Sequence, residues 1–291
     1  MFNKNLVPLT YFRSPKELVV GGLTIAEKFE KAGSSLPQDE APILPNGRKI
    51  NYLFDLISHL KEDLEDDLKI LGAGVFGNVH ESAVLINKDK IRIEAGATIG
   101  PLVVIDASNG PVVIREKTIV HPHTILRGPI YIGKDCRIAG ELVHSVFLDY
   151  SNKGHYGFIG HSYIGSFVNL GAGTTNSNLK NNYTNVGIYN DGTMIDSGQT
   201  FLGTFIGDHT KTAIGTMIYT GCIIGVSANL FGEPYYKKMI PSFAWGTKGR
   251  QKVEQAIETA KAAMARRGIE FSSKDEALFM EIFTSTEFSK I

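Results

Sequence analysis

The feature that most limits the fold of this chain is a six-residue period between about residues 71 and 232. Large apolar residues recur at that spacing, with shifts between runs, at Ile93, Ile99, Ile105, Ile114, Val120, Leu126, Ile132, Ile138, Ile164, Leu170, Ile206, Ile218, Ile224 and Leu230. A half-buried strand repeats every two residues and an amphipathic helix every 3.6, so neither alone explains the pattern. A fixed repeat of this kind indicates a solenoid.

A second set of inward positions accompanies the first. Small or modestly apolar residues stand four places after most of the large ones, at Ala97, Val103, Thr118, Thr124, Cys136, Val168, Thr174, Thr210, Thr216, Cys222 and Ala228. Glycine often follows the large residue, where a corner needs backbone freedom. The pattern resembles the hexapeptide repeat of left-handed parallel β-helices, in which three hexads complete one triangular coil. That resemblance implies a mainly β fold and the left hand; the alternative is a β-sandwich with chance spacing.

The regions that flank the repeat differ from it in pattern. We predict a mixed helical and extended segment over 1–70, the β-helix over 71–232 and a helical tail over 233–291. Within the first segment, Asn51 is expected to cap a helix whose leucines recur up to Leu68. In the tail, helices are expected near 249–267 and 273–285, where they could cover the open end of the solenoid. The repeat breaks near 144–158 and 176–200, which predicts loops that carry the chemistry.

Composition limits the class of partner. Thirty basic and thirty acidic residues balance, so no strong field favours nucleic acid or an anionic membrane. No apolar stretch is long enough to span a bilayer, and the first ten residues do not resemble a signal peptide. Cys136 and Cys222 lie inside repeat stretches, which predicts buried thiols in a reducing compartment. We therefore expect a cytoplasmic protein whose partners are small molecules and copies of itself.

The most informative motif covers residues 152–178, N-K-G-H-Y-G-F-I-G-H-S-Y-I-G-S-F-V-N-L-G-A-G-T-T-N-S-N. It resembles the acetyltransferase domain of the bifunctional enzymes that make UDP-N-acetylglucosamine. In that family a loop histidine is followed by an aromatic-Ile-Gly, a second Ile-Gly and then V-N-I-G-A-G-T. The residues at those spacings here are His155, Ile159, Gly160, Ile164, Gly165, Asn169, Gly171, Ala172, Gly173, Thr174 and Asn178.

The resemblance implies a role for each part of this motif. His155 would be the general base for attack on an acetyl thioester, a task that suits imidazole near neutral pH. Asn169 and Asn178 would bind a sugar acceptor, and the backbone N–H of Ala172 would stabilise the oxyanion. Family members are trimers with sites between subunits, so Asn178 would serve a neighbour's His155 in a homotrimer.

The same resemblance implies acetyl-CoA as cosubstrate, with no metal needed for the transfer. Ser197 and Ala213 would lie along the coenzyme A groove, although simple hexad packing explains both residues equally well.

The motif also departs from the family pattern. Phe158 and Leu179 stand where the family has tyrosines, so two hydroxyls that would meet a sugar phosphate are missing. Arg127, Lys153 and Lys180 are nearby candidates for binding that phosphate. The acceptor is therefore predicted only as a sugar, a sugar phosphate or a nucleotide sugar, modified at an amine or a hydroxyl.

The opening stretch, N-L-V-P-L-T-Y-F-R-S-P-K-E-L-V-V-G-G-L-T-I-A-E-K-F, resembles a group of longer bacterial proteins described as putative sugar nucleotidyltransferases. Those proteins carry a nucleotidyltransferase domain before the β-helix. Here no G-x-G-T-R phosphate loop is present, so pyrophosphorylase activity is not expected. The G-A-G-V-F-G stretch at 72–77 is followed by a strand-like pattern, and a dinucleotide fingerprint needs a helix there, so we interpret it as the entry to the repeat.

Two other functions stay open. One is a γ-carbonic-anhydrase-like metalloenzyme, in which three histidines hold zinc between subunits, although the H-x-x-x-x-H pair of that family is missing here. The other is a non-catalytic trimeric scaffold or sugar-nucleotide-binding module, which the loss of the two tyrosines would favour.

Overall fold

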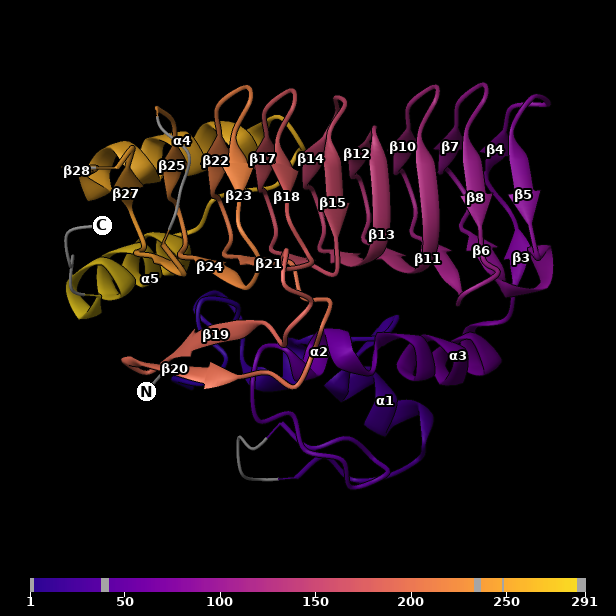
Figure 1. Cartoon of the computed structure of the whole chain (residues 1–291), viewed down its shortest axis with the longest axis horizontal. Coiled ribbons are helices and arrows are strands. Elements are labelled where there is room, and N and C mark those ends of the chain that lie inside the picture. The colour runs from indigo at the N-terminus through magenta and orange to yellow at the C-terminus, as the bar shows by residue number, and fades with distance from the viewer. Residues whose placement is uncertain (1–2, 38–41, 233–236, 248, 287–291) are drawn as a thin grey trace.

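The computed structural model describes residues 3–37, 42–232, 237–247 and 249–286. From β3 (Gly74–Val75) onward the chain winds into a parallel β-solenoid (Figure 1). The predicted mainly β, hexapeptide-type solenoid is thereby confirmed, while its left hand stays a prediction. The G-A-G-V-F-G stretch contains β3, as expected for the entry to the repeat.

The described coils lay short strands on three faces, which we call the first, second and third face. The first face consists of β4 (Asn78–Val79), β7 (Thr98–Ile99), β10 (Ile119–Val120), β12 (Arg137–Ile138), β14 (Asn152–Lys153), β17 (Asn169–Leu170), β22 (Lys211–Thr212), β25 (Asn229–Leu230), β27 (Ala244–Trp245) and the antiparallel β28 (Gly249–Arg250).

The second face begins with β3 and continues through β6 (Ile91–Ile93), β9 (Val112–Ile114), the second halves of β11 (Ile125–Ile132) and β13 (Glu141–Phe147), β16 (Tyr163–Ile164), β21 (Thr204–Ile206), β24 (Cys222–Ile224) and β26 (Met239–Ile240). The third face holds β5 (Val84–Ile86), β8 (Val104–Asp106), the first halves of β11 and β13, β15 (Phe158–Gly160), β18 (Thr175–Asn176) and β23 (Met217–Ile218). The short 3-10 helix η2 (Lys88–Lys90) precedes β6.

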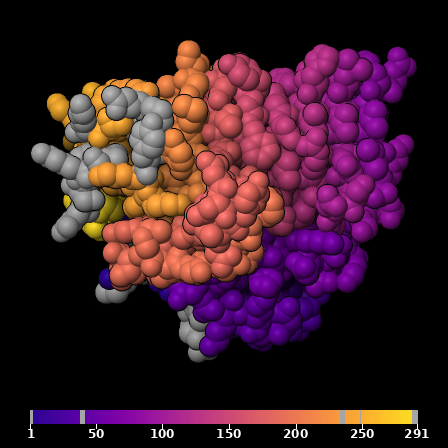
Figure 2. All heavy atoms as spheres, viewed as in Figure 1, coloured from indigo at the N-terminus to yellow at the C-terminus, as the bar shows by residue number. Residues whose placement is uncertain are grey.

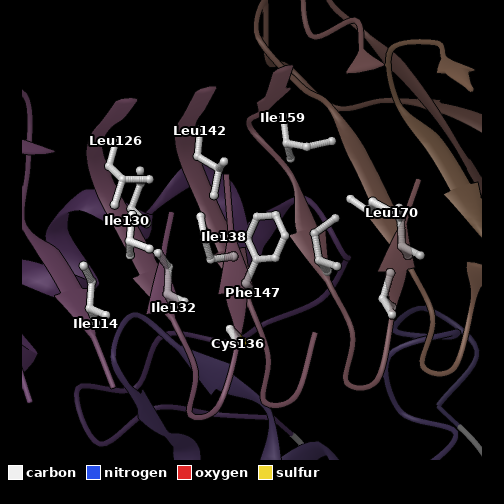
Figure 3. Packing of buried hydrophobic residues seen from close by; sticks show 14 of the residues in the cluster. Ile114, Leu126, Ile130, Ile132, Cys136, Ile138, Leu142, Phe147, Ile159 and Leu170 are labelled. Atoms are coloured by element: carbon white, nitrogen blue, oxygen red, sulfur yellow. The ribbon is translucent and has the colours of Figure 1, made fainter. Parts of the chain in front are cut away.

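Both predicted sets of inward residues fill the interior of the solenoid. The large apolar residues form one continuous buried cluster, and Figure 3 shows Ile132, Ile138 and Phe147 pointing into it. The small residues of the second set are buried as well. Threonine is tolerated there because its hydroxyl bonds to the neighbouring coil: Thr118 Oγ1 donates to the carbonyl of Gly133 at 2.7 Å and Thr210 Oγ1 to that of Gly225 at 2.6 Å.

The two predicted breaks in the repeat have different structures. Residues 144–158 do not form an extended loop, because β13, β14 and β15 keep them within the coils. The pairing of Arg137 with Asn152 spans 15 residues, whereas Lys211 pairs with Asn229 after 18, so the first break is a shortened coil. The prediction of a loop on the face of the solenoid was wrong for this stretch.

The second break is a true insertion. It forms an antiparallel hairpin of β19 (Gly187–Asn190) and β20 (Thr193–Asp196). Buried Val186, Ile188 and Leu202 pack this insertion against the N-terminal segment, and Figure 2 shows both lying over one side of the solenoid.

The N-terminal segment covers the second face. It contains η1 (Pro15–Glu17), β1 (Val19–Val20), β2 (Leu23–Thr24), α1 (Ile25–Lys31), α2 (Asp55–Ser58) and α3 (Leu60–Leu71). Apolar side chains that point outward from the second face pack against the leucines of the N-terminal segment. Tyr163, on the second face, also donates its hydroxyl hydrogen to the carbonyl of Val19 at 3.0 Å. Asn51 is not the predicted helix cap, because the carboxylate of Asp55 accepts the N–H groups of Asn51 and Tyr52 instead.

The C-terminal helices α4 (Val253–Ala265) and α5 (Ser273–Ser285) match the predicted ranges closely. They lie along the side of the solenoid as well as near its end (Figure 1). Asn229 Nδ2 donates to Gln251 Oε1 just before α4, and Arg267, just after it, donates to Asn152 Oδ1 at 2.7 Å. Helix α4 therefore runs back along the first face from β25 to β14.

A ring cluster joins the three parts of the chain. The imidazole of His209 lies 5.4 Å from the ring of Phe12, 5.1 Å from Phe167 and 5.2 Å from Phe279, measured between centroids. These rings come from the N-terminal segment, the solenoid and α5. Both cysteines are free and buried, as predicted, and no helix in the described ranges is long and apolar enough to cross a membrane.

Candidate functional site

The first face carries a column of polar side chains that point away from the core. Arg137, Asn152, Asn169, Lys211 and Asn229 pair with one another in register from coil to coil. Each stands immediately before an inward residue, and successive residues in a strand point to opposite sides. The repeat therefore aligns these five polar groups in one row.

A cleft of about 660 Å³ lies between this row and the end of α4. Its lining includes His155, Asn169 and Ala172, three of the residues that the sequence motif predicts to work together. Such a volume is in the range of small-ligand sites. On the opposite side the lining comes from Ala263, Arg266 and Arg267.

His155 stands on the corner between β14 and β15. Its side chain is exposed, and within the described residues its imidazole makes no hydrogen bond or ion pair. Next to it Tyr156 is 72% exposed. The ring nitrogens of His155 are therefore open to the cleft and to whatever enters it.

The backbone of the V-N-L-G-A-G-T stretch presents a donor to the same cleft. Gly171 N–H donates to the carbonyl of Thr212, Gly173 N–H to that of Tyr156, and Thr174 N–H to that of Gly171. Ala172 accepts a bond from Gly215 at its carbonyl, but in the described part of the chain its N–H has no partner. An N–H that lines a cleft without a partner is suited to an anion or an oxyanion.

Four cationic side chains, Arg137, Lys211, Arg266 and Arg267, also line the cleft. Asp135 pairs with both Arg137, at 2.7 Å, and Arg267, at 3.3 Å, while Arg266 is exposed. Burial lowers the pKa of Lys211 to about 8, and its ammonium donates to the carbonyl of His209 at 3.0 Å. One carboxylate thus faces several cations, and the cleft favours an anionic ligand.

Aromatic rings and a second histidine complete the lining. Tyr150 and Phe167 stack with centroids 4.7 Å apart. Phe167 continues into the ring cluster around His209. His121 also lines the cleft, and its pKa is lowered, chiefly by burial and further by the positive charge of Arg137. The lining therefore combines rigid aromatic rings with cationic side chains.

The structure does not bring all predicted site residues to this cleft within one chain. Asn178 Nδ2 donates to His161 Nδ1 at 2.8 Å beside the insertion, and Ser197 is buried with its hydroxyl on the carbonyl of Val186. Ala213 neighbours Gly171 at the edge of the cleft.

The three predicted phosphate-binding cations also lie elsewhere. Arg127 pairs with Glu141 on the third face, Lys180 donates to Thr184 and Asn185 in the insertion, and Lys153 is completely buried inside the solenoid. The roles of these residues toward a ligand stay predictions.

Sequence reasoning missed the cations that do line the cleft. Arg137 and Lys211 could have been found from the register of the first face, because both precede an inward position at the place that Asn152 and Asn169 occupy. Arg266 and Arg267 had no such signal, since only the return of α4 along the solenoid places them there. Among the described residues no group of three or more His, Cys, Asp or Glu side chains could hold a metal ion.

The parallel β-solenoid and the exposed loop histidine agree with the resemblance to an acetyltransferase domain that the sequence motif predicts. Curated relatives are similar to the chain over this region. A bifunctional sugar-1-phosphate nucleotidylyltransferase/acetyltransferase from Sulfurisphaera tokodaii is 36% identical over 112 residues, which cover 38% of this chain and 27% of the relative. The bifunctional protein GlmU of Cyanothece sp. is 32% identical over 136 residues, or 46% of this chain and 25% of that protein.

The predicted resemblance to the acetyltransferase part of such proteins is confirmed, although the chain spans only about a quarter of their length. No protein-family model matches the chain. Among solved structures, a hexapeptide transferase family protein from Anaplasma phagocytophilum is similar over 72% of this chain and 92% of its own, with 12% identity and a TM-score of 0.24. A mutant of perosamine N-acetyltransferase from Caulobacter crescentus, in complex with CoA and GDP-perosamine, has 13% identity over 72% of this chain and 83% of its own, with a TM-score of 0.18.

Proposed function

We propose that this protein transfers an acyl group, acetyl in the first instance, from coenzyme A to an amine or hydroxyl of a sugar-type acceptor. The observation that carries the proposal is that one cleft is lined both by His155, whose imidazole is exposed, and by Ala172, whose N–H has no partner among the described residues. Acyl transfer needs a base at the attacking group and a donor at the carbonyl oxygen. The similarity to bifunctional acetyltransferases supports the same reaction class.

The reaction follows from these two groups. His155 takes the proton of the acceptor N–H or O–H as the nitrogen or oxygen attacks the thioester carbonyl carbon. The new C–N or C–O bond converts the carbonyl oxygen to an oxyanion, which accepts a hydrogen bond from the Ala172 N–H. Collapse of the intermediate breaks the C–S bond, and the proton held by His155 passes to the departing thiolate. The products are the acylated acceptor and free coenzyme A.

The cations that line the cleft indicate which substrates it would bind. Arg137, Arg266, Arg267 and Lys211 are placed to meet phosphate groups, which both coenzyme A and a sugar phosphate or nucleotide sugar carry. This arrangement favours phosphorylated acceptors over neutral sugars. Their position differs from that of the predicted cations Arg127, Lys153 and Lys180.

A homotrimer is part of the proposal. The N-terminal segment covers the second face and α4 covers part of the first, whereas on the third face Val84 is 50% exposed and Met217 53% exposed. Exposed apolar side chains on an otherwise uncovered face are suited to self-association. A neighbouring chain would then bring Asn178 toward His155, and the assembly would work in the cytoplasm.

The test is release of free thiol from acetyl-CoA with a panel of amino sugars, their phosphates and their nucleotide conjugates. We expect turnover with a phosphorylated acceptor that His155→Ala abolishes, whereas the exposed, remote His80→Ala retains it. Equal activity of wild type and His155→Ala would refute the role of the base.

The alternative is a non-catalytic sugar-nucleotide-binding protein. It is favoured by Phe158 and Leu179, since Phe158 is half-buried on the third face and Leu179 forms a β-bridge with Phe201. Neither side chain offers a hydroxyl to a ligand. Binding of a nucleotide sugar without thiol release from any acceptor would support this alternative.

A further inference from the structure

One charged side chain occupies a position that the repeat reserves for the core. Lys153 is the inward residue of β14, in register with Ile138 of β12, and Leu170 holds the matching inward place in β17. Its relative exposure is 0%, like that of the apolar residues around it. An isoleucine or leucine would continue the column, so the lysine requires a separate explanation.

Burial of an ammonium group costs several kcal/mol unless it is hydrogen-bonded. The Nζ of Lys153 donates to the carbonyl of His155 at 2.5 Å and to the carbonyl of Tyr156 at 2.9 Å. Burial lowers the pKa of Lys153 to about 8, and no carboxylate among the described residues offsets this. The lysine therefore extends from the core to the corner on which the candidate base stands.

The other bonds of this corner show what Lys153 adds. The carbonyl of Tyr156 also accepts the N–H of Gly173 at 3.0 Å, and the carbonyl of Gly157 accepts the N–H of Glu141 at 3.0 Å. The carbonyl of His155 has Lys153 as its sole partner within the described residues. Without the ammonium, the carbonyl of His155 would lose this partner, and the bonds at Tyr156 and Gly157 would still hold the corner to the solenoid.

We propose that Lys153 is a positioning residue, which holds the backbone of His155 so that the imidazole faces the acceptor. The inference rests on the proposed function, because it assigns Lys153 a part in the same transfer. It replaces the sequence prediction that Lys153 binds a phosphate, since the ammonium lies inside the solenoid and not in the cleft. The fixed position of His155 then explains why the protein keeps a buried ammonium group that costs free energy of folding.

Lys153→Met is the decisive variant, because methionine fills the core position without a donor. We expect kcat to fall by roughly 10- to 100-fold, as for a misplaced catalytic group, with KM for donor and acceptor changed by less than about 3-fold. The melting temperature should be retained or raised, because the buried charge is gone. Lys153→Gln keeps an N–H donor on a shorter side chain and should have an intermediate kcat.

Lys238→Met is the matched control. The ammonium of Lys238 also donates to a backbone carbonyl, that of Thr220, and burial lowers its pKa, but it lies outside the cleft. This variant should leave kcat unchanged. If Lys153→Met does not fold, Lys153→Gln and the control carry the comparison.

Hydrogen exchange separates this inference from the proposed reaction. Amides 154–157 should exchange faster in Lys153→Met and not in Lys238→Met, whether or not an acceptor is known. Unchanged exchange, or a loss of kcat that only follows a lower melting temperature, would overturn the positioning role. Silence of the wild type toward every acceptor, with the expected exchange difference, would instead refute the proposed reaction alone.

Discussion

Two glycines flank His155 and Tyr156, and the structure predicts opposite consequences for replacing them by alanine. At Gly157 the backbone has φ +125°, and an added Cβ would lie 2.2 Å from the carbonyl oxygen of Thr174. At Gly154 no atom of the described residues lies within 4 Å of the added Cβ, and φ lies outside the left-handed region. The two substitutions are chemically identical and three residues apart.

The cost at Gly157 has two sources. A non-glycine residue in this backbone region costs about 1–3 kcal/mol, and the contact with Thr174 can be relieved only by moving main chain of the next coil. We therefore expect Gly157→Ala to lower the free energy of unfolding by about 2–4 kcal/mol. Gly154→Ala should change it by less than about 0.5 kcal/mol.

Urea denaturation followed by circular dichroism measures both values, and thiol release measures the effect on His155. In Gly157→Ala the corner has to shift, so kcat should fall by at least about 10-fold, while Gly154→Ala should keep most of its activity. If Gly157→Ala is as stable and as active as Gly154→Ala, then the close packing of this corner, and the fixed place of His155 that follows from it, are wrong.

Three further predictions concern the core, acid stability and the cleft. Ile138→Ala, in the middle of the solenoid, should cost about 2–5 kcal/mol in urea denaturation, whereas Leu102→Ala, which is 53% exposed, should cost less than about 0.5 kcal/mol. Burial lowers the pKa of His209 to about 3. The contribution of His209 to the free energy of unfolding is therefore complete above its unfolded pKa near 6.5 and is lost as the pH falls toward 3, by at most about 1.4 kcal/mol per pH unit. His209→Phe should flatten the curve of unfolding free energy against pH in this range. Arg266→Ala should raise KM for a phosphorylated substrate by roughly 5- to 30-fold with little change in kcat, as for one lost charge-assisted hydrogen bond, in initial-rate kinetics.

The same experiments can contradict each expectation. An Ile138→Ala protein as stable as Leu102→Ala would mean that the solenoid interior is not close-packed. An equally steep acid slope in wild type and His209→Phe would place the acid sensitivity elsewhere, for example at His161, whose pKa burial also lowers to about 3. A KM unchanged by Arg266→Ala at low salt would remove α4 from the binding surface.

The interior of the solenoid could be predicted from the sequence because each inward position depends on its own hexad. Ile99, Val120 and Ile138 follow from spacing alone, and all three are buried. The shortened coil between Arg137 and Asn152 could not be recognised in this way, since a deletion and an insertion disturb a period equally. The error has a direct consequence, because a loop over 144–158 would leave Lys153 open to phosphate, whereas the shortened coil directs it inward.

The candidate site shows the same limit on a larger scale. His155 and Ala172 were found because they lie in one continuous motif, whereas Arg266 and Arg267 opposite them directly follow α4, about 100 residues further along the chain. Only the return of the tail along the first face brings them together, and this return is held by Asn229, Gln251, Arg267 and Asn152. Two of these four residues belong to the outward column of the first face, so the row that lines the cleft also anchors the helix that closes it. Substitutions in the outward column of the first face are therefore expected to alter the docking of α4 as well as ligand binding. Variants of Asn152 in particular should affect both the stability of the tail and the affinity for phosphorylated ligands.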